Sequence, residues 1–141
     1  MVVEKRQVEL VKLSENCKYN KIELNKDAKI GVITSGIAYQ YAKEALGDSV
    51  SYLKLGMVNP LPKQLIKDFA SQVDTLYVIE ELDDIIEHHV KALGIDCIGK
   101  EIFTYLGEDV YKRQIPGSTS ATAAIKPAIA KGSNAKMPPF S

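Results

Sequence analysis

The sequence has little of several features that would assign it to a specialised class of protein. Its 18 basic and 18 acidic residues balance to a net charge of zero, which gives no support for binding to nucleic acid or to an anionic membrane surface. No apolar run approaches the roughly 20 residues that a membrane span needs, and the N-terminal residues lack the apolar core of a signal peptide. Cys17 and Cys97 do not make a disulfide framework. We therefore expect a soluble, cytoplasmic protein that binds neither nucleic acid nor membrane.

Motifs that carry chemistry by themselves are also absent. The chain has no G-x-G-x-x-G fingerprint, no Lys-Ser/Thr phosphate loop, no C-x-x-C pair and no Ser-His-Asp arrangement. Asp84 and His88 stand four residues apart and share one face of an expected helix, but two ligands are too few for a structural metal site. A solvated helix face explains this pair better. We expect no catalytic residue and no metal ligand in this chain.

The sequence does contain the patterns of a strand, a tight turn and a helix in succession between residues 28 and 47. The apolar run at residues 30–33 suits a strand that is buried on both faces of a parallel sheet. After a Thr-Ser-Gly turn, apolar residues recur at helical spacing over residues 38–46, and Gly47 stands where a C-terminal cap belongs. This succession predicts the opening of a βαβ unit.

The same alternation continues along the chain. Further strands are expected over residues 50–55, 74–80 and 96–98, with helices between them. The apolar stripes that predict these helices are Leu65, Ile66, Phe69 and Ala70 for the first and Leu82, Ile85, Ile86, Val90 and Leu93 for the second. The pattern β-α-β-α-β-α-β predicts an α/β fold with three layers, in which a mostly parallel sheet carries helices on both faces.

Changes in composition divide the chain into three parts. Residues 1–27 are interpreted as an N-terminal arm or interdomain helix followed by a polar connection, and residues 28–108 as the α/β core domain. Residues 109–141 contain a turn-forming PGSTS cluster and an alanine-rich run, which predict a C-terminal helix and a linker to a missing domain.

Small and acidic residues follow the expected strands at the carboxyl-terminal edge of the sheet, where ligands or neighbouring domains dock in open α/β folds. They are Ser35 and Gly36 after the first strand, Gly56 after the second, and Glu80 and Glu81 after the third. The turn at Ser35 could cradle a phosphate, but its low glycine count favours a tight turn that touches a neighbouring domain. The two acids suit a helix N-terminus. Beyond that role, we expect Glu80 to face outward and Glu81 to start the helix.

Four motifs in the same order resemble the middle domain of the alpha subunit of indolepyruvate:ferredoxin oxidoreductase. They are KIGVITSGIAYQYAKEAL, SYLKLGMVNPLP, LYVIEELDDIIEHHVKALG and GKEIFTYLGE, and the resemblance covers about residues 19–108. This family belongs to the thiamine-diphosphate-dependent 2-oxoacid:ferredoxin oxidoreductases, whose middle domain has the transketolase C-terminal-domain fold. The closing MPPFS also resembles the segment that leads into a C-x-G-C-P-H motif in the family, which is absent here, and residues 109–114 depart from the family pattern.

The resemblance implies that the full-length enzyme uses thiamine diphosphate and magnesium (Mg) to decarboxylate an arylpyruvate oxidatively to an acyl-CoA. It also implies that four-iron–four-sulfur (4Fe–4S) clusters pass the electrons to ferredoxin. This chain would be a non-catalytic structural and assembly domain that binds none of these cofactors. Its expected partners are the pyrimidine- and diphosphate-binding domains of the same chain, with the beta subunit and ferredoxin in the full enzyme.

Two alternatives of a different kind remain open at this point. One is a free-standing nucleotide- or CoA-binding α/β module, with its ligand near Ser35, Gly56 and Glu80. The other is the C-terminal domain of another thiamine enzyme, such as a transketolase or the beta subunit of a 2-oxoacid dehydrogenase.

Overall fold

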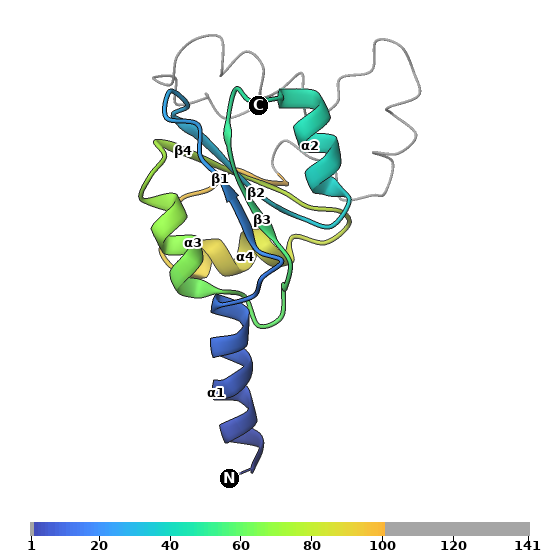
Figure 1. Ribbon diagram of the computed structural model, residues 1–141, viewed down its shortest axis with the longest axis vertical. Coiled ribbons are helices and arrows are strands. Elements are labelled where there is room, and N and C mark those ends of the chain that lie inside the picture. Colours follow the sequence, from blue (N-terminus) through green and yellow to red (C-terminus); the bar gives the residue numbers. More distant parts are fainter. Residues whose placement is uncertain (1, 101–141) are drawn as a thin grey trace.

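The computed structural model describes residues 2–100, in which helices cover both faces of a four-stranded sheet and one further helix extends away from it (Figure 1). The predicted C-terminal helix and linker at residues 109–141 lie outside the described residues. In chain order the elements are α1 (Val2–Glu15), β1 (Lys21–Glu23), β2 (Ile30–Ser35), α2 (Ala38–Leu46), β3 (Ser51–Leu55), α3 (Lys63–Ala70), β4 (Thr75–Ile79) and α4 (Ile85–Ala92).

The sheet has the strand order β1-β3-β2-β4. Strand β2 pairs in parallel with both β3 and β4, whereas β1 is an antiparallel edge strand. This arrangement confirms the predicted α/β fold with a mostly parallel sheet. The sequence interpretation misses β1, which lies in the expected polar connection, because three residues that are exposed or half-buried show no apolar alternation. The strand expected over residues 96–98 makes only a single bridge, between Ile98 and Tyr77.

Two apolar cores lie on opposite faces of the sheet. Side chains alternate along β2, so Ile33 points to the face covered by α3 and α4 and packs in one core with Phe69 and Val90. Val32 points to the opposite face and packs in the second core with Tyr39 of α2. Burying a side chain of this size contributes about 1.5–3 kcal/mol. The two cores confirm the expected helical cover on both faces and fix the positions of the strand ends.

Helix α4 begins later than its sequence stripe predicts. The expectation that Leu82 and Ile85 belong to the buried stripe is wrong, because these side chains are 61% and 54% exposed. Leu82 has a φ of +58°, a left-handed conformation that does not fit a right-handed α-helix. The helix therefore starts at Ile85, and Ile86 and Val90 form its buried apolar face.

Helix α1 projects away from the sheet and is held to the domain through its last turn (Figure 1). Ser14 is fully buried, and its hydroxyl donates a hydrogen bond of 2.6 Å to the carbonyl oxygen of Pro60. The carboxylate of Glu15 accepts hydrogen bonds of 2.8 and 3.0 Å from the backbone N–H groups of Gln64 and Leu65, in the first turn of α3. Among residues 2–100, no helix has the length and apolar character that crossing a membrane requires.

Candidate functional site

The candidate residues from the sequence gather at one edge of the sheet, where the parallel strands end. Ser35 at the end of β2 pairs with Leu55 at the end of β3, and Thr34 pairs with Ile79 at the end of β4. The turns that follow these strands therefore lie next to one another, as their shared direction predicts. We call this set of turns, at residues 36–37, 56–62 and 80–84, the carboxyl edge.

Gly56 has a packing role at this edge. A Cβ atom built on Gly56 would overlap the Cβ of Tyr19 and lie 2.7 Å from the carbonyl carbon of Tyr19. The backbone N–H of Gly56 also donates a hydrogen bond of 2.9 Å to the side-chain oxygen of Asn20. Glycine is needed here because the segment after α1 passes close to the end of β3.

Glu80 points inward and serves helix α4. Its two carboxylate oxygens accept hydrogen bonds from the backbone N–H groups of Ile86, at 2.8 Å, and Glu87, at 3.0 Å, and the residue is 8% exposed. Burial raises the pKa of the Glu80 carboxyl. The expectation that Glu80 faces outward and Glu81 serves the helix is therefore wrong: the Glu80 carboxylate accepts the first N–H groups of α4, whereas Glu81 is exposed.

A second buried acid lies beside Glu80. Glu87 is 5% exposed. Its carboxylate accepts a hydrogen bond of 2.7 Å from the backbone N–H of Lys100 and forms an ion pair of 2.7 Å with the ammonium group of Lys91. The ammonium group of Lys100 donates a hydrogen bond of 2.9 Å to the backbone carbonyl of Glu80. These contacts satisfy both carboxylates inside the domain, so the pair holds α4 to the end of β4.

The turn between β2 and α2 is the least constrained of the three. Gly36 has a φ of +54°, and a Cβ built there would meet no atom within 4 Å. Ser35 is half-buried. Helix α2 begins after Ile37 without a side-chain cap.

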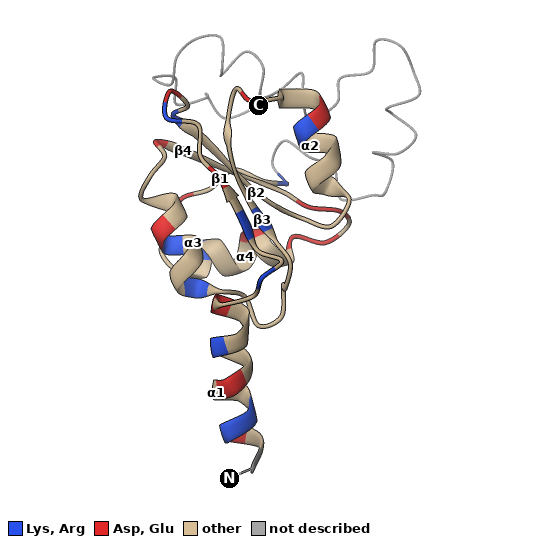
Figure 2. Cartoon of the chain, in the orientation of Figure 1, with Lys and Arg blue, Asp and Glu red and all other residues tan. Residues whose placement is uncertain are grey.

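Exposed apolar side chains lie on the carboxyl edge, which the sequence stripes do not predict. One stands in each turn, with Ile37 47% exposed, Val58 41% and Leu82 61%, and Ile85 adds a fourth at the start of α4. Figure 2 shows acidic residues in the connection between β4 and α4, and among them Glu81 and Asp83 are exposed. The edge therefore offers apolar contacts beside a negatively charged turn, an arrangement suited to docking a protein surface.

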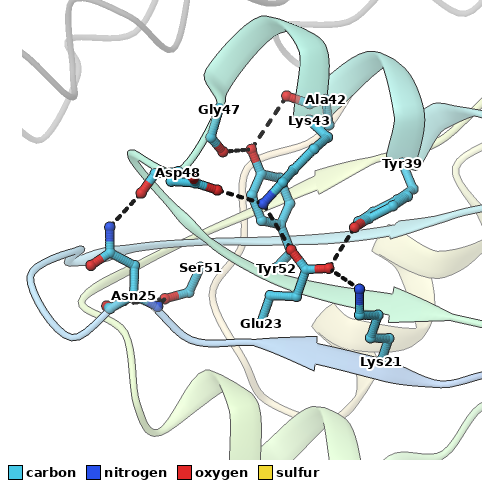
Figure 3. A network of polar contacts seen from close by, with 10 residues as sticks. All are labelled: Lys21, Glu23, Asn25, Tyr39, Ala42, Lys43, Gly47, Asp48, Ser51 and Tyr52. Atoms are coloured by element: carbon cyan, nitrogen blue, oxygen red, sulfur yellow. Dashed lines mark hydrogen bonds and ion pairs between the residues drawn. The ribbon is translucent and has the colours of Figure 1, made fainter.

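A polar network ties the edge strand β1 to helix α2 on one face of the sheet (Figure 3). The carboxylate of Glu23 accepts a hydrogen bond of 2.6 Å from the Tyr39 hydroxyl and pairs with Lys21 at 2.6 Å and Lys43 at 2.8 Å. These contacts, with that to Lys21 the strongest, lower the pKa of Glu23 to about 2. Lys43 also pairs with Asp48 at 2.7 Å. Sequence reasoning misses this network because its members, which also include residues of β3, lie up to 31 residues apart on three strands and helices and in the connections between them.

The other members of the network are aromatic and turn residues. The Tyr52 hydroxyl donates a hydrogen bond of 2.7 Å to the carbonyl oxygen of Gly47, and burial raises the pKa of Tyr52 to about 12. Asn25 donates to the carbonyl oxygen of Asp48 through its side chain, and its backbone N–H donates a hydrogen bond of 3.0 Å to the Ser51 hydroxyl. The network therefore closes the end of α2 onto β3.

The described residues do not fit a metal or an iron–sulfur cluster. Within residues 2–100, no group of three or more His, Cys, Asp or Glu side chains is placed to hold a metal ion. Asp84 and His88 do pair at 3.1 Å, as their spacing predicts. Cys17 is half-buried after α1, and Cys97 is buried in the core beside α3 and α4.

The chain is similar to curated proteins named indolepyruvate oxidoreductase subunit IorA. It is 39% identical to that of Archaeoglobus fulgidus over 84 residues, which cover 55% of this chain and 14% of the relative. For Pyrococcus abyssi the identity is 39% over 110 residues, covering 71% and 17%. For Methanothermobacter marburgensis it is 34% over 135 residues, covering 84% and 21%. No protein-family model matches the chain.

Proposed function

Because the chain belongs to the family of indolepyruvate oxidoreductase subunit IorA, we propose that it is a non-catalytic assembly domain of an indolepyruvate:ferredoxin oxidoreductase. It spans between about a seventh and a fifth of the length of the curated relatives described above. The enzyme as a whole would convert arylpyruvates to acyl-CoA by oxidative decarboxylation and transfer the electrons to ferredoxin. The domain would have the transketolase C-terminal-like fold.

The proposal assigns the cofactors to other parts of the enzyme. Thiamine diphosphate with magnesium would supply the carbanion chemistry, and 4Fe–4S clusters would carry the electrons. This assignment is supported by the lack, among residues 2–100, of any group of three His, Cys, Asp or Glu side chains that could hold a metal ion.

One observation carries the assembly role: the exposed apolar side chains of Ile37, Val58 and Leu82, one in each turn of the carboxyl edge. Scattered apolar residues on a protein surface are ordinary, but their placement on adjoining turns is typical of a surface that another domain covers. The pyrimidine- and diphosphate-binding domains, with the beta subunit, are the proposed occupants. The edge is the part of an open α/β sheet at which such docking occurs.

Substitutions on this edge test the proposal in the full-length oxidoreductase. Asn replaces Ile37 in one variant and Leu82 in another, because Asn is polar and tolerates the left-handed conformation of Leu82. Leu24→Asn is the matched control, since Leu24 is 51% exposed and follows β1 at the opposite edge of the sheet. We expect the edge variants to weaken subunit association in light scattering and to lower ferredoxin reduction by arylpyruvate.

The thermal stability of the isolated chain separates docking from folding. All three replaced side chains are exposed, so their melting temperatures should match that of the unsubstituted chain within a few degrees. Association and turnover that stay normal in Ile37→Asn and Leu82→Asn would reject the assembly role of this edge. Equal losses in Leu24→Asn would also reject it, because the effect would not be specific to the edge.

A further inference from the structure

Two lysines and a threonine form a row across the sheet, one residue before β2 ends. Strand pairing aligns Lys21 of β1 with Lys54 of β3, Lys54 with Thr34 of β2, and Thr34 with Ile79 of β4. Residues paired in this way point to the same face of the sheet, and their side chains are neighbours. Thr34 shares its face with Val32, two residues earlier, which packs against α2. The row therefore lies on the α2 side of the sheet.

Thr34 brings an unsatisfied polar group to this row. Its residue is 0% exposed, and its hydroxyl has no hydrogen-bond partner among the described residues. A buried hydroxyl without a partner destabilises a fold, and nearly all buried polar groups in proteins are satisfied. The observation points to an acceptor or donor that is supplied from outside residues 2–100.

The start of helix α2 lies above the same end of β2. Ile37 precedes the helix without a side-chain cap, and the first turn contains no acidic residue. The first turns of α3 and α4 differ, because the carboxylates of Glu15 and Glu80 accept hydrogen bonds from their N–H groups. The N–H groups and the dipole of α2 therefore remain available to a negatively charged group.

Lys54 supplies an uncompensated positive charge at this place. Its ammonium group lies 5.0 Å from the ring centre of Tyr39, the second residue of α2, and it makes no ion pair among the described residues. The neighbouring charges cancel one another: the ammonium groups of Lys21 and Lys43 are balanced by the carboxylates of Glu23 and Asp48 (Figure 3).

We propose that Thr34, Lys54 and the N-terminal turn of α2 form a binding site for an oxyanion of the phosphate type. Lys54 would move from the ring of Tyr39 to pair with the anion beside Thr34, its neighbour on β2, and the anion would have to displace the atoms that bury the Thr34 hydroxyl. That hydroxyl and the N–H groups at residues 37–39 would then donate hydrogen bonds to the anion oxygens. The exposed turn at Gly36 gives a ligand larger than the anion room to extend. This inference does not depend on the assembly role.

Inorganic phosphate is the probe for the test. The complete 141-residue chain is titrated with phosphate at constant ionic strength, with sodium chloride as the balancing salt, and followed through its backbone amide NMR signals. We expect saturable shifts concentrated on residues 36–39, with a dissociation constant in the millimolar range. Shifts that stay linear in phosphate concentration, or that spread over the exposed lysines of α1, would overturn the proposal.

Two variants assign the site to its residues. Lys54→Met keeps the length of the side chain and removes its charge, and we expect it to weaken phosphate binding by about tenfold, which is the loss of one charge-assisted contact. Lys29→Met, at the opposite end of β2, is the matched control and should bind phosphate normally. Unchanged affinity in Lys54→Met, or an equal loss in the control, would overturn the proposal.

Thr34→Val separates a ligand site from a defect in the core. Valine has the same shape as threonine but lacks the unsatisfied hydroxyl, so the variant should be at least as stable as the unsubstituted chain in phosphate-free buffer. Its affinity for phosphate should nevertheless fall by about threefold or more. A variant that gains stability and keeps full affinity would show that the hydroxyl does not face a ligand, and the site would be rejected.

Discussion

The backbone N–H of Ile86 donates a hydrogen bond of 2.8 Å to the carboxylate of Glu80, six residues before it. A carboxylate from the end of a buried strand thus takes the place of the missing side-chain cap of α4, whose N-cap residue Asp84 makes no such bond. The contact satisfies an N–H group that the first helical turn would otherwise leave open. It fixes the position of α4 relative to β4, and with it the turn that carries Leu82.

Glu80→Ala should therefore destabilise the chain by about 1–3 kcal/mol, because it leaves buried N–H groups without an acceptor. Glu81→Ala is the matched control, since Glu81 is exposed in the same turn. Its free energy of unfolding should stay within about 0.5 kcal/mol of the original. Urea unfolding of the two variants measures the difference. Equal stabilities would contradict the reversed roles of these acids.

The stability of the chain should depend on pH through Glu23. Its pKa is lowered from the ordinary 4.5 to about 2 in the folded state. Glu23 therefore contributes stability that is present above pH 4.5 and is lost as the pH falls from 4.5 towards 2. Its side chain is 23% exposed, so solvent screening limits the effect to about 1 kcal/mol. Glu23→Gln should lose that amount at pH 7 and show a smaller fall in stability between pH 4.5 and 2.

Urea unfolding of the unsubstituted chain and of Glu23→Gln at several pH values measures this difference in stability. The pKa of Glu80 is raised by burial, so its titration acts in the opposite sense: the folded state loses part of its stability as the pH rises from the ordinary pKa through the raised value. The two acids can therefore be told apart by the sign of the pH dependence that each variant removes. A Glu23→Gln variant with the same stability loss at pH 2 and pH 7 would contradict the ion-pair network.

The alternation of apolar residues predicts most of the sheet and its helical cover. The run at residues 30–33 is apolar on both faces, and the structure buries it between two cores, as expected of a central parallel strand. Strand β1 could not be predicted in this way, because pairing with β3 holds it at the edge without an apolar face of its own. The predicted burial of Leu82 fails for a related reason. Its apolar side chain fits the helical spacing, but its left-handed backbone conformation keeps it out of the helix, and the side chain is exposed.

The site was predictable in position but not in the roles of its residues. Strand direction alone brings Ser35, Gly56 and Glu80 to one edge. Which neighbour in the acidic pair turns inward depends on the path of the turn, which brings the N–H groups of Ile86 and Glu87 to Glu80 and not to Glu81. The role of Gly56 depends on its contact with Tyr19, which joins segments 37 residues apart and leaves no local signal beyond the glycine itself.

Gly56→Ala should destabilise the chain by about 1–3 kcal/mol, because the added methyl group displaces the backbone of Tyr19. It should also weaken the hydrogen bond between the N–H of Gly56 and Asn20. Gly36→Asn is the control, because Gly36 has open space around it and Asn tolerates its positive φ. Thermal unfolding should show a lower melting temperature for the first variant and a nearly unchanged one for the second. An unchanged melting temperature for Gly56→Ala would contradict this packing role, because the segment at Tyr19 would then move aside at little cost in free energy.

Glu15 joins α1 to α3 through its carboxylate. A helix of 14 residues is marginal in water by itself, and α1 exposes Val8, Leu10 and Leu13 along most of its length. Its orientation therefore depends on the last turn, where the Glu15 carboxylate accepts the N–H groups of Gln64 and Leu65.

Glu15→Ala should cost about 1 kcal/mol, as the loss of a helix cap does, and should speed amide exchange at residues 64 and 65. Glu9→Ala, in the exposed middle of α1, provides the matched control and should change neither quantity. Glu15→Gln retains one oxygen acceptor and should fall between the two. If amide exchange at residues 64 and 65 stays slow in Glu15→Ala, the first turn of α3 does not depend on this carboxylate, and the Ser14 contact with Pro60 must hold the arm alone.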